Sequence, residues 1–176
     1  MTPDIPALLA LCASADIDYV LGGSVAAMAH GVDLVPGDLD IVPALYFSNL
    51  ERIANLLRLI EAEPEGFGYW TTREDGRRKW IVEPLTEERL NGWRPDPSDL
   101  DTLDHLFLTP HGNFDIVPSL MGTYEELFPH SVEVQIGGRF VRVLTVNLLI
   151  ERLRTSSRAK DAARLEALMD LRKANQ

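Results

Sequence analysis

The segment YVLGGSVAAMAHGVDLVPGDLDIVP, residues 19–43, carries most of the functional information in this chain. Its first apolar run ends at Gly22-Gly23-Ser24, and its second apolar run contains Asp38 and Asp40. Successive side chains of a strand point to opposite faces, so the two aspartates are expected to share one face. The apolar residues that alternate with them are then expected to point into the core.

A third aspartate, Asp115, lies in a similar apolar frame, Phe114-Asp115-Ile116-Val117. If the two strands are neighbours, three carboxylates converge. Grouped carboxylates repel one another unless a cation neutralises them, and Mg²⁺ prefers such oxygen ligands while keeping positions open for substrate phosphates. A cluster of this kind can hold two ions about 3.5–4 Å apart. The pattern therefore predicts a site for two Mg²⁺ ions at Asp38, Asp40 and Asp115.

The Gly22-Gly23-Ser24 turn suits the other half of such a site, a phosphate. Glycines let the backbone approach an anion closely, and a helix N-terminus presents free N–H groups to it. Ser24 is predicted to cap the helix that follows and ends at Gly31, and to offer a hydroxyl donor. Each motif alone is common as a plain turn or a solvated strand edge. The order strand, Gly-Gly-Ser, helix, Asp-x-Asp strand and later Asp strand is far rarer.

In this combination the chain resembles the nucleotidyltransferase superfamily that shares its fold with DNA polymerase β. Within it, the chain is similar to the small bacterial enzymes grouped with the AbiEii toxins and the lincosamide nucleotidyltransferases. The resemblance runs from about residue 19 to residue 171. It is carried by Gly22-Gly23-Ser24, Ala27, His30-Gly31, the Asp38–Pro43 run, Gly112–Asp115, Val132–Val134, Val141–Val143 and Arg158–Asp161.

The resemblance implies transfer of a nucleoside monophosphate from an NTP to a hydroxyl, with release of pyrophosphate. It makes Asp38, Asp40 and Asp115 the catalytic metal ligands, and Asp115 also helps to deprotonate the acceptor. The triphosphate would be held by Ser24 and the backbone of Gly22 and Gly23. The acceptor implied is tRNA, a protein or a small molecule, and one setting is a toxin paired with an antitoxin protein.

One position departs from the family pattern. Relatives often carry a lysine in the penultimate helix, where this chain has Leu153. Either Arg152 or Arg154 replaces that charge, or the grip on the triphosphate is weakened. Lys160 is a further candidate phosphate contact, with a plain surface lysine as the alternative. A catalytically weakened nucleotide- or partner-binding module of the same fold is the second interpretation, and a metal-dependent phosphohydrolase is a third.

The remaining sequence predicts an α+β domain with a mixed sheet and C-terminal helices, the polymerase β-like fold. We expect a single domain over residues 1–176, with a catalytic core over 1–145 and a helical part over 146–176. Predicted helices cover residues 6–15, 24–31, 48–61, 84–90, 146–154 and 158–172. Predicted strands cover residues 18–21, 39–42, 69–72, 79–82, 105–109, 113–117, 132–136 and 140–144, with a turn-rich break at 63–68.

Composition narrows the class of protein. The chain has 176 residues, 45% of them hydrophobic, and a formal net charge of −10. The acidic charge lies in residues 1–150, which disfavours non-specific nucleic-acid binding, whereas the last 26 residues are basic. The N-terminus has no basic segment before its apolar run, and no apolar run is long enough for a membrane span. We expect a cytoplasmic protein without membrane contact.

Several residues with functional potential have a simpler structural interpretation. Cys12 is the only cysteine, which rules out an intrachain disulfide, and it lies in an apolar helical stretch typical of a buried thiol. His30 is expected to bond or pack near the end of its helix. The three tryptophans are expected to pack in the core or in hairpins.

Overall fold

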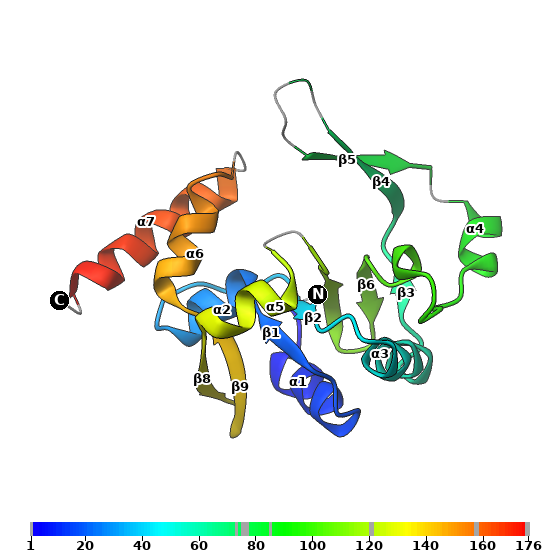
Figure 1. Ribbon diagram of the computed structural model, residues 1–176, viewed down its shortest axis with the longest axis horizontal. Coiled ribbons are helices and arrows are strands. Elements are labelled where there is room, and N and C mark those ends of the chain that lie inside the picture. The colour runs from blue at the N-terminus through cyan, green and yellow to red at the C-terminus, as the bar shows by residue number, and fades with distance from the viewer. Residues whose placement is uncertain are drawn as a thin grey trace.

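The computed structural model places a single large sheet at the centre of the chain, with helices around it and a separate two-stranded hairpin (Figure 1). It describes residues 2–72, 74, 78–84, 86–119, 122–156 and 159–174. The sheet has seven strands, in the order β3 (Glu63–Pro64), β6 (Leu106–Thr109), β7 (Gly112–Ile116), β2 (Leu39–Pro43), β1 (Tyr19–Leu21), β9 (Arg139–Leu144) and β8 (Ser131–Ile136).

This sheet is mixed. β2 runs parallel to β7, and β1 runs parallel to β9, whereas the other neighbouring pairs are antiparallel. β4 (Phe67–Thr72) and β5 (Arg78–Glu83) form the separate antiparallel hairpin. The predicted α+β class with a mixed sheet is therefore confirmed.

Helices occur between the strands and at the end of the chain. The core cluster joins the buried face of the sheet to side chains of α1, α2, α3, α6 and α7. Figure 1 shows α6 and α7 at one end of the sheet and the β4–β5 hairpin towards the other. The described helices are α1 (Ile5–Ser14), α2 (Gly23–Ala29), α3 (Phe47–Leu59), α4 (Glu87–Gly92), α5 (Tyr124–Leu127), α6 (Val146–Leu153) and α7 (Ala159–Ala174), with short 3-10 turns η1 (Leu100–Thr102) and η2 (Phe128–His130).

Local sequence explains where these helices begin and which face they bury. Asp4 caps α1 by accepting a hydrogen bond from the Ala7 amide, and Thr145 caps α6 in the same way at Leu148. α3 buries residues that recur three and four positions apart, as its periodicity predicts. None of the helices in the described part of the chain is both long and apolar enough to cross a membrane.

Two segments differ from the sequence-based expectation. The predicted turn-rich break over residues 63–68 contains the short edge strand β3 and the first residues of β4. Residues 124–130, for which no element is predicted, form α5 and η2; α5 starts at a capping box in which Thr123 and Glu126 bond each other's backbone. The Asp75-Gly76 turn predicted for the β4–β5 hairpin lies outside the described residues.

Candidate functional site

Three aspartates come together where β2 lies beside β7. Asp40 and Asp115 pair directly across the two parallel strands, and Asp38 lies just before β2. One carboxylate oxygen of each residue lies within 4.8 Å of the other two, and all three residues are half-buried. The condition stated from the sequence is met, because the two strands are neighbours and bring the three carboxylates to one place.

The core on the opposite face of the sheet holds these aspartates in register. Leu39 and Ile41 flank the aspartate of β2, Phe114 and Ile116 flank that of β7, and all four apolar side chains have no exposed surface. A shift of either strand by one residue would turn an aspartate into the core and an apolar side chain out of it. Hydrophobic burial therefore fixes the position of the carboxylates.

The donor set of this cluster fits magnesium. Two oxygens bound to the same Mg²⁺ at about 2.1 Å lie at most about 4.2 Å apart. The observed 4.8 Å limit exceeds that by an amount that side-chain rotation can remove. Three carboxylates this close also repel one another in the absence of a cation, so cation binding relieves an unfavourable interaction.

The Gly22-Gly23 turn presses directly against this cluster. The Gly22 amide donates a hydrogen bond to the backbone oxygen of Asp40 over 3.2 Å. Gly23 has a φ of +59°, and a Cβ added to it would lie 1.7 Å from the Oδ2 atom of Asp40. Glycine is therefore required at position 23 for two reasons. Its backbone is left-handed, and the carboxylate of Asp40 occupies the space that a Cβ would need.

Ser24 does not have the capping role predicted for it. α2 begins one residue earlier than expected, and its N-cap is Gly22, which has an extended backbone. Ser24 is consequently a residue of the first helical turn, where its hydroxyl donates to Oδ1 of Asp38 over 3.4 Å, a long hydrogen bond. The side chain is 4% exposed and faces the carboxylates.

A cavity of about 360 Å³ opens beside the aspartates. Its walls come from the start of α2, from the loop that joins α2 to β2, and from α7. The lining residues are Ser24, Val32, Asp33, Leu34, Val35, Gly37, Asp38, Ala163, Arg164 and Ala167. The site is therefore larger than the predicted motifs, because α7 forms one of its walls.

Arg164 is the lining residue that sequence reasoning missed. The sequence directs attention to Lys160, whose side chain lies outside the part of the chain that the structure describes. Arg164 is one helical turn further along α7 and reaches the cavity. The sequence gives one indication that Arg164 is held in place, its i, i+3 spacing from Asp161, which allows an ion pair. The sequence does not indicate which face of α7 meets the cavity.

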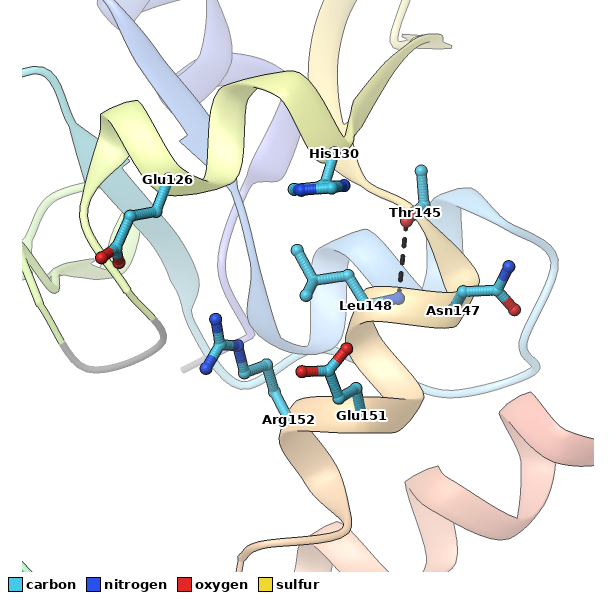
Figure 2. Close-up of a pocket in the computed structure, with 7 residues that line it drawn as sticks. All are labelled: Glu126, His130, Thr145, Asn147, Leu148, Glu151 and Arg152. Carbon is cyan, nitrogen blue, oxygen red and sulfur yellow. Dashed lines mark hydrogen bonds between the residues drawn. The ribbon is translucent and has the colours of Figure 1, made fainter.

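A second cavity, of about 560 Å³, lies between α5–η2 and α6 (Figure 2). It shares no lining residue with the cavity beside the aspartates. Its lining residues are Glu126, His130, Thr145, Asn147, Leu148, Glu151 and Arg152. Of the two arginines predicted to replace the expected lysine, Arg152 lines this second cavity, and Arg154 is the exposed C-cap of α6. Leu153 itself packs against the core.

The simpler interpretations of His30, Trp93 and Cys12 agree with the structure, whereas the side chains of Trp70 and Trp80 lie outside the described part of the chain. His30 Nε2 lies 2.8 Å from the Leu144 oxygen, which ties the end of α2 to β9. Trp93 packs against Phe107 and donates its indole N–H to the Thr102 oxygen. Burial raises the pKa of the Cys12 thiol to about 12, so this thiol stays protonated at neutral pH.

Comparison with known proteins gives little further information. No protein-family model matches the chain, and no curated protein matches it. Among solved structures, the chain is similar to the crystal structure of a “putative nucleotidyltransferase” from Thermotoga maritima, with a TM-score of 0.41 and 14% identity over 94% of each chain. The low TM-score and identity make this a distant likeness that carries no conclusion about the activity of the chain.

Proposed function

We propose that this chain is a metal-dependent nucleotidyltransferase that moves a nucleoside monophosphate from an NTP to a hydroxyl acceptor. The observation that supports this most is the convergence of Asp38, Asp40 and Asp115 within 4.8 Å, against a glycine turn that admits no side chain at Gly23. Paired strands that present carboxylates beside such a turn offer the two things this reaction needs, metal ligands and close backbone approach to phosphates.

In the proposed reaction, Asp38 and Asp40 would hold one Mg²⁺ ion, and Asp115 would contribute to the site of a second. The bound ions would neutralise charge on the phosphates. Asp115 would also help to deprotonate the acceptor hydroxyl. The acceptor oxygen then bonds to the α-phosphorus, the bond from that phosphorus to the bridging oxygen breaks, and pyrophosphate leaves. Most of the rate gain would come from positioning and electrostatics.

The triphosphate would be held by the backbone of Gly22 and Gly23 and by the Ser24 hydroxyl. Lys160, near the start of α7, remains a proposed contact of the triphosphate. The acceptor proposed from the family resemblance is tRNA, a protein or a small molecule, and the proposed setting includes a toxin whose antitoxin is a second protein.

The decisive test is turnover of each NTP with Mg²⁺, measured as pyrophosphate release and as transfer of label to total tRNA, protein or small acceptors. We expect Asp38→Asn and Asp40→Asn each to lower turnover by about a thousandfold, because each removes a charged metal ligand. Asp170→Asn is the control, since this exposed aspartate of α7 lies on the surface beside Lys173. Equal activity in the parent chain and both site variants would contradict the proposal.

The packing of Leu153 against the core favours a second candidate, a nucleotide-binding module with little or no turnover. A lysine at this position is absent, so the charge it would supply must come from elsewhere or is lost. Calorimetry with NTP and Mg²⁺ separates the two candidates. Tight binding without pyrophosphate release, in the presence of every acceptor class, would support the module.

A further inference from the structure

The cavity beside the aspartates has an asymmetric charge distribution. The carboxylates of Asp33 and Asp38 lie on the wall formed by the loop before β2, and Arg164 lies on the α7 wall. Among the lining residues in the described part of the chain, Arg164 is the one cation; the remainder are neutral or acidic. A ligand that spans this cavity would therefore meet carboxylates, with any metal they hold, on one side and a guanidinium on the other.

The Arg164 side chain is held in place. It is 14% exposed, and its Nη1 atom lies 3.8 Å from Oδ1 of Asp161, which is 1% exposed. Asp161 also accepts a hydrogen bond from the Ser156 hydroxyl, just before α7 begins. Burying a charged pair this deeply carries a desolvation cost that a surface pair avoids. The arrangement fixes the guanidinium more tightly than a solvated helix arginine would be fixed.

The geometry of the Asp161 pair leaves Arg164 able to bind an anion. A guanidinium carries five N–H donors in a planar fork, and one carboxylate oxygen at 3.8 Å engages few of them. The fork matches phosphate oxygens in a bidentate manner, and such charge-assisted bonds are roughly twice as strong as neutral ones. Phosphate is thus the chemical group that suits this wall of the cavity.

We propose that Arg164 binds the terminal phosphates of the NTP and that Asp161 is the positioning residue that aims its guanidinium into the cavity. This inference rests on the proposed function, because it assigns a ligand to the same site. An NTP whose reacting phosphate lies at the aspartates would extend its β- and γ-phosphates past Ser24 and across the cavity to Arg164 on α7, away from the carboxylate of Asp33. The charge that Leu153 does not provide then comes from the neighbouring helix.

A purely structural role for the same pair predicts something different. If Arg164 and Asp161 only fasten α7 against α6, their loss lowers stability and affects all ligands alike. If Arg164 binds phosphate, its loss weakens ligands in proportion to their phosphates, raises the KM for NTP and changes kcat little. The two roles can therefore be distinguished by how the loss of affinity depends on the phosphates of the ligand, and by whether KM or kcat changes.

The test uses inorganic tripolyphosphate as the probe, with Mg²⁺ present, against the full-length parent chain, Arg164→Gln, Arg164→Lys and Arg172→Gln. Arg172 is the matched control, an arginine of the same helix that does not line the cavity. We expect Arg164→Gln to weaken tripolyphosphate binding and to raise the KM for NTP by about tenfold or more. Arg164→Lys should recover part of the loss, and Arg172→Gln should match the parent chain.

Thermal unfolding of each variant shows whether a loss of binding reflects a loss of fold. Asp161→Asn should raise the KM for NTP by less than Arg164→Gln does, while kcat stays near the parent value. Unchanged tripolyphosphate affinity in folded Arg164→Gln would overturn the inference, as would an equal loss in Arg172→Gln or no binding to the parent chain.

The outcomes also separate this inference from the proposed function. If Asp38→Asn removes turnover while Arg164→Gln keeps the parent KM, the result supports the enzyme assignment and contradicts the role of Arg164. If no NTP is turned over but tripolyphosphate binds in an Arg164-dependent manner, the result contradicts the enzyme assignment and supports the phosphate site.

Discussion

The two charged sides of the candidate site are built in different ways. One side, the acidic wall, consists of Asp38, Asp40 and Asp115. It rests on β2 and β7, two paired strands whose opposite face is fully buried. The cationic wall is Arg164 on α7, a helix that is docked by Leu168 in the core and in which Arg164 pairs with the buried Asp161. Sheet register holds the first wall, and helix docking holds the second. Chemistry that needs positions accurate to fractions of an ångström belongs on the first, while binding of a flexible phosphate tail tolerates the second.

The largest effect should come from the acidic wall. We expect Asp40→Asn or Asp115→Asn to lower turnover by about a thousandfold, since metal ligation is worth several kcal/mol in the transition state. Arg164→Gln should cost about tenfold in kcat/KM by comparison. Steady-state kinetics of the three variants on one NTP measures the contrast, and a larger loss in the Arg164 variant would reverse the ranking of the two walls.

The turn against the acidic wall should be the next most sensitive feature. Gly23→Ala places a Cβ on the carboxylate of Asp40 at a left-handed φ, and should lower the free energy of unfolding by about 2–4 kcal/mol. Urea denaturation followed by circular dichroism measures it. Gly66→Ala is the control, since a Cβ there meets nothing within 4 Å, and it should change the free energy by less than about 0.5 kcal/mol. Equal stability of Gly23→Ala and the parent chain would refute the close approach.

Restoring the expected lysine should not improve the cationic wall. Leu153 packs against the core, so Leu153→Lys is expected to cost about 1–3 kcal/mol of stability and leave the KM for NTP no lower. Arg154→Lys, at the exposed end of α6, is the control and should leave stability within about 0.5 kcal/mol. A lower KM in Leu153→Lys would show that α6, and not α7, faces the triphosphate.

The smallest effect should be a pH dependence of the sheet that carries the acidic wall. His105 is buried beside Phe67 and Phe107, and its backbone oxygen accepts from the Ile116 amide. Burial lowers the pKa of His105, outweighing the nearby Asp101. As the pH falls, His105 is therefore protonated at a higher pH in the unfolded chain than in the folded chain. Stability is full above the ordinary pKa of about 6.5 and declines below it, by at most about 1.4 kcal/mol per pH unit.

Urea midpoints at pH 7.5 and pH 5.5 measure this dependence. His105→Gln should flatten it, whereas His130→Gln, an exposed residue of η2, should leave it as in the parent chain. A dependence that survives in His105→Gln would place its origin in another group.

The acidic wall could be predicted from sequence because its information is local. Alternation along two short apolar runs places Asp40 and Asp115 on one face, and one parallel pairing brings them together. The observed N-cap of α2 is Gly22, two residues before the predicted Ser24, because Gly22 takes the extended N-cap conformation and Gly23 already belongs to the helix. The prediction that Ser24 caps the helix was wrong for that reason. The position of Ser24 beside the carboxylates does not depend on a capping role.

The cationic wall could not be predicted, because it depends on how a terminal helix docks. Several cations precede and follow Asp161 within a few residues, and periodicity does not say which of them faces the acids. The α5–η2 segment was missed for a related reason, since four helical residues give too short a period to recognise. Both features are set by long-range packing, which a single sequence does not display.

The contact between Gly23 and Asp40 also gives a criterion for sorting chains of this type found in genomes. Aspartates at the three site positions can persist for structural or solubility reasons after activity has gone. A chain that keeps all three but has any side chain at the position of Gly23 cannot keep the carboxylate where it lies here. We expect such a chain to lack the turnover proposed here, and the residue at this one position is enough to identify it.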